Sequence, residues 1–175
     1  GKGVPLTHGN VVSNGFQVAT ALGVGPSDCY LHAAPMFHSA DLLGTAVTLA
    51  GGSHSYLAQT SPQGVVDAIV ARKATMTMVP PVLLDGIVHS GLLEGRAFDA
   101  LRIFICGGAP VPFDLLEMGA KQMPTTSLIQ GYGLTETSPI LSFLHLPQAR
   151  AVGDAKVLQS SGKPLAGIEM RLLDV

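Results

Sequence analysis

The segment Gly131–Thr137, which reads Gly-Tyr-Gly-Leu-Thr-Glu-Thr, carries the residue types best suited to chemistry in this chain. Its two glycines permit a close backbone approach to a ligand, and Tyr132 between them offers a flat face for stacking on a planar ring. Thr135 supplies a hydroxyl for a phosphate, and Glu136 supplies a hard carboxylate oxygen of the kind that Mg²⁺ prefers. The combination suits a nucleotide; the alternative is an ordinary tight turn that leads into a helix.

Two other motifs could form walls around such a ligand. Gly107-Gly108-Ala109-Pro110 follows an apolar run, and its glycines could let a flat group lie against the backbone, or could serve only a strand–helix turn. Pro35-Met36-Phe37-His38 ends another apolar run, and His38 could gate a pocket or be a partly buried histidine with satisfied hydrogen bonds. No role is assigned to His32, His54 and His89.

The elements that must position these motifs alternate between apolar runs and segments of helical spacing. Ser61 and Pro62 form a typical helix start, with Ser as the cap and Pro in the first turn. Asn10 is the expected cap of the first helix. The expected strands are 28–34, 53–58, 75–79, 101–106 and 127–130, and the expected helices are 11–22, 41–50, one that starts at 61–62, 82–89 and 112–123.

The order strand, turn, helix and strand again is typical of βαβ units in a parallel sheet. Strands that are apolar almost throughout fit a sheet that is covered on both faces. We therefore predict an α/β fold with a mostly parallel sheet of about five strands and helices on both faces, flavodoxin-like or Rossmann-like. In such sheets ligands bind beyond the carboxyl ends of the strands, which is where the three motifs lie.

Charged side chains make up only 13% of the 175 residues, against a usual ~25%. Disordered chains and coiled coils are excluded by this composition, and a net charge of −2 without a basic cluster predicts no nucleic-acid partner. No apolar stretch reaches the ~18 residues of a transmembrane segment. With no signal-peptide pattern and two separated cysteines, Cys29 and Cys106, we expect a cytoplasmic protein.

Six short segments together resemble the adenylate-forming (AMP-binding) family of acyl-CoA synthetases and ligases. In the order that the family has them, they are Lys2-Gly3-Val4 with Leu6-Thr7-His8 and Asn10, Pro35–His38, Val79-Pro80-Pro81, Leu101–Pro110, Gln130–Thr137 and Gly162–Gly167. The segment at 130–136 matches the family signature Q-G-Y-G-x-T-E and is the most specific of them. Two residues depart from the family pattern, since Gly1 and Ala166 stand where it has proline.

The resemblance implies ATP-dependent activation of a carboxylic acid as an acyl-adenylate, followed by thioester formation with coenzyme A. It implies ATP, Mg²⁺ and coenzyme A as cofactors or co-substrates. The implied nucleotide-binding residues are Gly107, Gly108, Ala109 and Pro110 along the adenine, with Tyr132 stacked on it between Gly131 and Gly133. The implied catalytic residues are Thr135 at the α-phosphate, Glu136 as the Mg²⁺ ligand and Lys2 in the phosphate loop, and His38 flanks the acyl pocket.

Within the family, Leu6–Asn10 and the segment Ala40–Gly52, rich in Ala and Gly, favour an acyl-CoA ligase over an amino-acid adenylation domain. A fatty acid is the first expectation for the substrate, and an aryl or short-chain acid is the second. A fatty-acyl-AMP ligase that passes its adenylate to a carrier protein is an alternative. We divide the chain into 1–27 (phosphate-loop tail and helix), 28–140 (parallel α/β subdomain) and 141–175 (the start of a β-rich segment).

We expect the chain to be a fragment of the large N-terminal domain of a longer enzyme. The family's Ser/Thr/Gly-rich loop, its T-G-D motif and its lid lysine are absent from the sequence, so we expect negligible adenylation activity from this fragment. The low charge predicts exposed apolar faces that associate, as a homodimer or in another form of self-association. A non-catalytic α/β fragment that only self-associates is therefore the alternative from another functional class.

Overall fold

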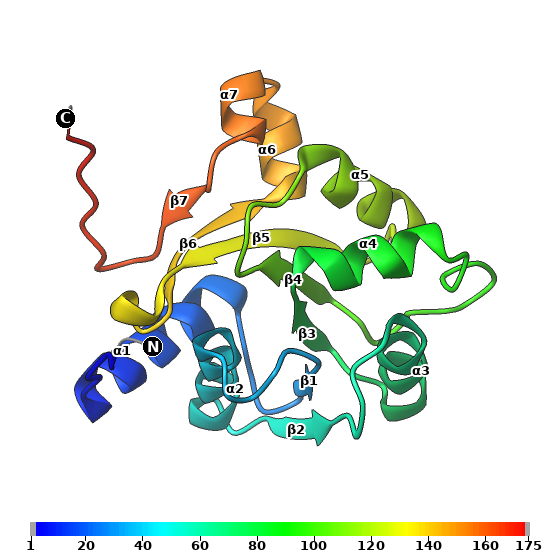
Figure 1. Cartoon of the computed structure of the whole chain (residues 1–175), viewed down its shortest axis with the longest axis horizontal. Coiled ribbons are helices and arrows are strands. Elements are labelled where there is room, and N and C mark those ends of the chain that lie inside the picture. Colours follow the sequence, from blue (N-terminus) through cyan, green and yellow to red (C-terminus); the bar gives the residue numbers. More distant parts are fainter. Residues whose placement is uncertain (1–2, 174–175) are drawn as a thin grey trace.

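The computed structural model describes residues 3–173. Its strands form one seven-stranded sheet at the centre of the fold (Figure 1). The strand order is β2-β1-β3-β4-β5-β6-β7, in which the first five strands are parallel and the last two are antiparallel. The strands are β1 (Cys29–His32), β2 (Ser53–Tyr56), β3 (Met76–Val79), β4 (Ile103–Gly107), β5 (Ser127–Gly133), β6 (Ile140–His145) and β7 (Lys163–Pro164). The prediction of a mostly parallel α/β sheet is confirmed, and its parallel part has the flavodoxin-like strand order.

Helices cover both faces of this sheet, as the apolar strands predict (Figure 1). One face carries α1 (His8–Leu22) and α2 (Gly44–Leu49), and the other carries α3 (Pro62–Arg72), α4 (Pro81–His89), α5 (Phe113–Gln122) and α6 (Leu146–Val152). The short elements are η1 (Ser39–Leu43), η2 (Thr135–Thr137) and α7 (Ala155–Leu158). None of the helices between residues 3 and 173 is long and apolar enough to span a membrane.

Local capping explains where the helices begin. Ser61 caps α3 as predicted, because its hydroxyl accepts a hydrogen bond from the Gly64 amide at 3.0 Å. The prediction of Asn10 as the cap of α1 is wrong. Thr7 is the cap, and Asn10 is the third residue of a capping box, in which each side chain accepts from the other residue's backbone amide.

One predicted helix differs from the structure in its start and its continuity. The helix expected over 41–50 is divided into η1 and α2, and η1 starts two residues earlier, at Ser39. The division of the chain at 27/28 and 140/141 stays a prediction. The sheet itself continues across the second boundary, because β6 pairs with β5 and is followed by α6 and α7.

An ion pair between the buried carboxylate of Asp28 and the partly exposed guanidinium of Arg102 ties the amino ends of the parallel strands together. The guanidinium of Arg102, which precedes β4, donates to both carboxylate oxygens of Asp28, which precedes β1, at 2.6 and 2.8 Å. The Thr75 hydroxyl also donates to Asp28, at 2.6 Å. Arg102 donates further to the Leu22 carbonyl at the end of α1. The pair therefore joins β1, β3, β4 and α1 at the sheet edge opposite the predicted site.

The surroundings of Asp28 set the pH range over which this pair stabilises the fold. Burial raises the pKa of the Asp28 carboxyl, but hydrogen bonds from Arg102, Thr75 and the Gly25 amide, together with the charge of Arg102, bring it from 3.8 to about 2. The folded-state pKa is thus below the unfolded one. The contribution to stability is fully present above the unfolded pKa and is lost as the pH falls towards 2.

We expect Asp28→Asn to lower the free energy of unfolding by roughly 2 kcal/mol at pH 7, because it leaves Arg102 without its counter-charge. The difference from wild type should shrink at pH 3, because the wild-type carboxyl is mostly protonated there in the unfolded chain. Urea unfolding at the two pH values measures this. Asp67→Asn is the matched control, since Asp67 is half-exposed and lies 2.6 Å from Arg96. An equal loss in the two variants would contradict the prediction.

Candidate active site

A cavity of about 200 Å³ lies at the carboxyl ends of the parallel strands, between η1, the end of β4 and the end of β5. This is the edge at which parallel sheets bind ligands. Six of the residues singled out from the sequence line it, namely His38, Gly108, Gly131, Gly133, Thr135 and Glu136. The topology therefore brings together motifs that lie nearly 100 residues apart in the chain.

The remaining predicted residues lie beside the cavity or outside the described residues. Tyr132 does not line the cavity and is 37% exposed. Gly107 is buried in β4, where it pairs with Gly131, while Ala109 and Pro110 are exposed in the loop that follows. Lys2 lies outside the described residues.

The Gly-Tyr-Gly motif is the last part of β5, whereas we expected the strand to end at residue 130. Its partner is β6, which the sequence did not identify as a strand, and Gly131 pairs with Phe143 in an antiparallel ladder. The pairing shifts between Tyr132 and Gly133. A Cβ at Gly133 would overlap the carbonyl oxygen of Pro139, so the close approach that requires glycine here is between two backbone segments.

Thr135 and Glu136 lie in η2, directly after β5. The Thr137 hydroxyl holds this turn by accepting from the Leu134 amide at 2.9 Å. The Thr135 hydroxyl lies 2.8 Å from that of Ser39 in η1, so the two loops are tied together. Ser39 was missed by the sequence reasoning. Its place next to His38 is the only local sign of it, because its partner is 96 positions away.

The surroundings of Glu136 fit the expectation of a cation ligand. Its side chain is exposed, and no Lys, Arg or His of residues 3–173 forms an ion pair with it. It also borders a second cavity of about 380 Å³, whose other side includes Pro5, Leu6 and Asn10. Its oxygens are therefore available to a hard cation such as Mg²⁺, close to the segment that follows the expected phosphate loop.

His38 lies at the rim of the cavity. Its Nδ1 accepts a hydrogen bond from the Ala40 amide at 3.1 Å, so its side chain caps η1. The neighbouring Phe37 is 93% exposed and Met36 is 63% exposed. The chain thus exposes two apolar side chains directly before the imidazole that lines the cavity.

The comparison with known families agrees with this geometry, since the family described as "AMP-binding enzyme" matches residues 1–175. The chain belongs to the AMP-binding enzyme family. It is 31% identical over 173 residues to a feruloyl-CoA synthase from Amycolatopsis, covering 98% of this chain and 34% of that protein. The chain therefore spans about a third of the length of this relative.

Solved structures of other family members have the same fold. A long-chain-fatty-acid–CoA ligase from Archaeoglobus fulgidus superposes with a TM-score of 0.80 at 26% identity, over 94% of this chain and 34% of that one. The o-succinylbenzoate coenzyme A synthetase from Bacillus subtilis, in complex with ATP and magnesium ion, also gives 0.80, at 28% identity, over 94% of this chain and 33% of that one.

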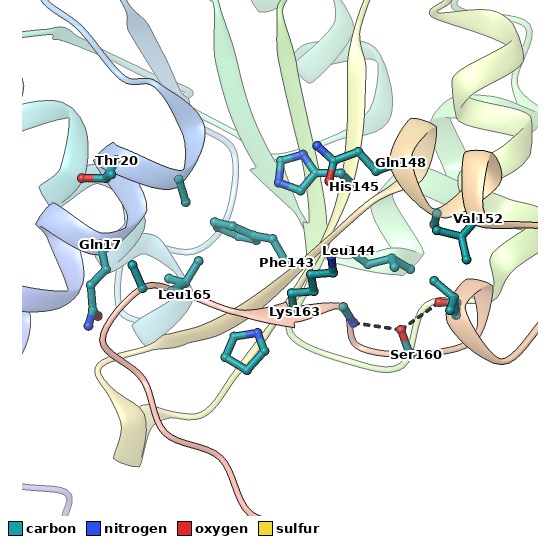
Figure 2. Close-up of a pocket in the computed structure, with 16 residues that line it drawn as sticks. Gln17, Thr20, Phe143, Leu144, His145, Gln148, Val152, Ser160, Lys163 and Leu165 are labelled. Carbon is teal, nitrogen blue, oxygen red and sulfur yellow. Dashed lines mark hydrogen bonds between the residues drawn. The ribbon is translucent and has the colours of Figure 1, made fainter. Parts of the chain in front are cut away.

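A larger cavity, of about 480 Å³, lies elsewhere in this family member, between α1, β6, β7 and the α6–α7 segment (Figure 2). Phe143, Leu144 and Leu165 make its lining largely apolar, and burial lowers the pKa of His145 beside them. Of the predicted catalytic and binding residues that lie within 3–173, none lines it. We place the candidate site at the smaller cavity, because a reaction needs the hydroxyl, carboxylate and imidazole that gather there.

We expect Gly133→Ala to destabilise the fold by at least about 3 kcal/mol, or roughly 6–12 °C in melting temperature, because β5 and the Pro139 backbone must move apart. Gly25→Ala is the matched control, since a Cβ at Gly25 meets nothing within 4 Å and φ there is not positive. Thermal unfolding followed by circular dichroism measures both. Equal melting temperatures for the two variants would show that the close approach at Gly133 is not required.

Proposed function

We propose that this chain is the nucleotide-binding part of an enzyme that activates a carboxylic acid with ATP as an acyl-adenylate and then transfers the acyl group to coenzyme A. One observation carries the proposal. The cavity at the carboxyl ends of the strands is lined by the glycines of two loops, by the Thr135 hydroxyl, by the Glu136 carboxylate and by His38. Membership of the AMP-binding family supports the same reaction class.

In the first step a carboxylate oxygen of the acid attacks the α-phosphorus of ATP, and the bond from this phosphorus to the bridging oxygen breaks, which releases pyrophosphate. Both reactants are anions, so the site must hold them together against their repulsion and stabilise the charge that develops on the phosphate. Mg²⁺ bound at Glu136 would supply positive charge to the phosphates. We assign the Thr135 hydroxyl, which lies 2.8 Å from that of Ser39, to a hydrogen bond with the α-phosphate.

The other residues take the roles that the family resemblance gives them. The adenine lies along Gly107, Gly108, Ala109 and Pro110, with the ring of Tyr132 stacked on it between Gly131 and Gly133. The exposure of the loop at 108–110 and of Tyr132 is compatible with this. Lys2 belongs to the phosphate loop, and His38 flanks the acyl pocket near the reacting carboxylate.

A fatty acid is the substrate that we propose, with an aryl acid as the alternative. The exposed Met36 and Phe37 beside His38 support an apolar acid of either kind. The similar proteins include one named for an aryl acid, a feruloyl-CoA synthase, and one named for a fatty acid, a long-chain-fatty-acid–CoA ligase. The alternative acceptor is a carrier protein in place of coenzyme A. We also propose a cytoplasmic location and self-association of the chain.

We expect Glu136→Gln to remove the Mg²⁺-dependent part of ATP binding, because the amide oxygen lacks the charge that holds the cation. Calorimetric titration of the chain with ATP should show at least about a tenfold loss of affinity with Mg²⁺ present and less than about twofold with EDTA. Glu94→Gln, at another exposed glutamate, should change neither value. An unchanged Mg²⁺ dependence in Glu136→Gln would contradict the metal assignment.

The 175-residue chain should bind nucleotide without turning it over, because it lacks the family's T-G-D motif and lid lysine. Pyrophosphate release should therefore stay at background with ATP, Mg²⁺ and coenzyme A and a panel of octanoate, palmitate, ferulate and 4-coumarate. Clear turnover with any of these acids would refute the expected inactivity of this fragment, and the acid used would identify the substrate class.

A further inference from the structure

A chain of polar side chains lies between β1, β2 and the η1–α2 segment, and the sequence reasoning gave its histidines no role. Nδ1 of His32 lies 2.8 Å from Oδ2 and 2.9 Å from Oδ1 of Asp41. Nε2 of His32 lies 2.8 Å from Nδ1 of His54, and Nε2 of His54 lies 3.0 Å from the Thr48 hydroxyl. The chain runs without a break from a buried carboxylate to an exposed hydroxyl.

The inner pair, Asp41 and His32, is buried, with only 8% of each residue exposed. Burying a carboxylate is costly unless it is paired, so the bond to His32 is required for Asp41 to lie there. The ring of Tyr56 stacks on His32 with centroids 4.5 Å apart and planes 10° apart. The His32 ring also lies close to Gly44, since a Cβ added at Gly44 would be 3.0 Å from Cε1 of His32.

The Asp41–His32 hydrogen bond can form whether His32 is neutral or charged, because it needs a proton only on Nδ1. Nδ1 of His32 must carry a proton, because a carboxylate only accepts. Nε2 of His32 and Nδ1 of His54 can hold only one proton between them, since two N–H groups would collide at 2.8 Å. Burial, and then the charge of His32, lower the pKa of His54, which agrees with this coupling.

The pair fixes the position of η1, which forms one wall of the candidate site. The Asp41 amide donates to the His38 carbonyl at 3.0 Å, so the residue held by His32 is bonded to the residue at the rim. Ser39 connects the start of η1 to Thr135. A 3₁₀ segment of five residues is not stable by itself, so its place depends on such anchors.

We infer that Asp41 and His32 are positioning residues, which hold His38 and Ser39 at the distance from Thr135 that the bound acid requires. The inference rests on the proposed function, because it assigns a role in the same site. It concerns only the side of the cavity formed by η1, where the acid would bind. The glycine loops at 107–110 and 131–133 follow β4 and β5 and take no part in the Asp41–His32 hydrogen bonds.

The test uses Asp41→Asn, which keeps the size of the side chain and removes its charge. Amide hydrogen exchange of the unliganded chain should become at least about tenfold faster at residues 40–44 and stay unchanged in α4 and β4. Affinity for octanoyl-sulfamoyl adenosine, an unreactive analogue of an acyl-adenylate, should fall about tenfold. Affinity for AMP should change less than about twofold, a split that general destabilisation would not produce.

Asp85→Asn is the matched control. Asp85 forms an exposed pair with His89, at 3.2 Å, on α4, which covers the opposite face of the sheet from η1. It should change neither the exchange nor the two affinities. Unchanged exchange at 40–44 and an unchanged affinity for the analogue in Asp41→Asn would overturn the inference. If the wild-type chain binds neither AMP nor the analogue, the proposed function fails, and the exchange measurement still decides whether the pair anchors η1.

A second variant serves if Asp41→Asn does not fold. Gly44→Ala keeps every charge, and its helical backbone (φ −56°, ψ −24°) accepts alanine, but the new methyl group presses on the His32 ring. The same faster exchange at 40–44 and the same split between the two ligands are expected. Wild-type exchange and affinities in this variant would also overturn the inference.

Discussion

The contact between Gly107 and Gly131 sets the geometry on which the site depends. The two residues pair across β4 and β5, and a Cβ on Gly107 would overlap the carbonyl oxygen of Gly131. Because neither residue carries a side chain, the ends of the two strands can stay paired up to the edge of the sheet. The loop at Gly108, where φ is +87°, and the motif that ends β5 therefore border the same cavity.

Stability and chemistry lie at opposite ends of the parallel strands. At the amino ends, Asp28 and Arg102 satisfy one another with Thr75, and the low pKa of Asp28 reflects how fully its charge is compensated. At the carboxyl ends, Glu136 is exposed and unpaired among the described residues. A carboxylate that stabilises the fold uses its hydrogen-bonding capacity within the protein, whereas one that binds a cation must keep it free.

The polar chain from Asp41 to Thr48 connects the η1–α2 segment, at the candidate site, to strands β1 and β2. It lies on the face covered by α2, where Tyr30 and His32 of β1 are neighbours of His54 and Tyr56 of β2. A core of apolar residues alone would leave the five-residue η1 without a directional bond to the sheet. The Asp41–His32 pair supplies that direction, since hydrogen bonds depend on geometry in a way that apolar contacts do not.

The sequence by itself determined the class of fold and the residues available for chemistry. Apolar runs between glycine and proline turns predict the parallel strands, Ser61-Pro62 predicts the start of α3, and the signature at 130–136 predicts the lining of the cavity. These are local properties, because propensity, capping and residue type do not depend on distant parts of the chain.

Only the tertiary structure decided which distant residues meet. Gly133 is the end of a strand because β6 pairs with it, and Ser39 bonds Thr135 across 96 positions. His32 meets His54 because β1 pairs with β2, and it meets Asp41 because η1 packs against β1. Such contacts follow from strand order, register and packing, which arise when the whole chain buries its apolar faces, and no local pattern specifies them.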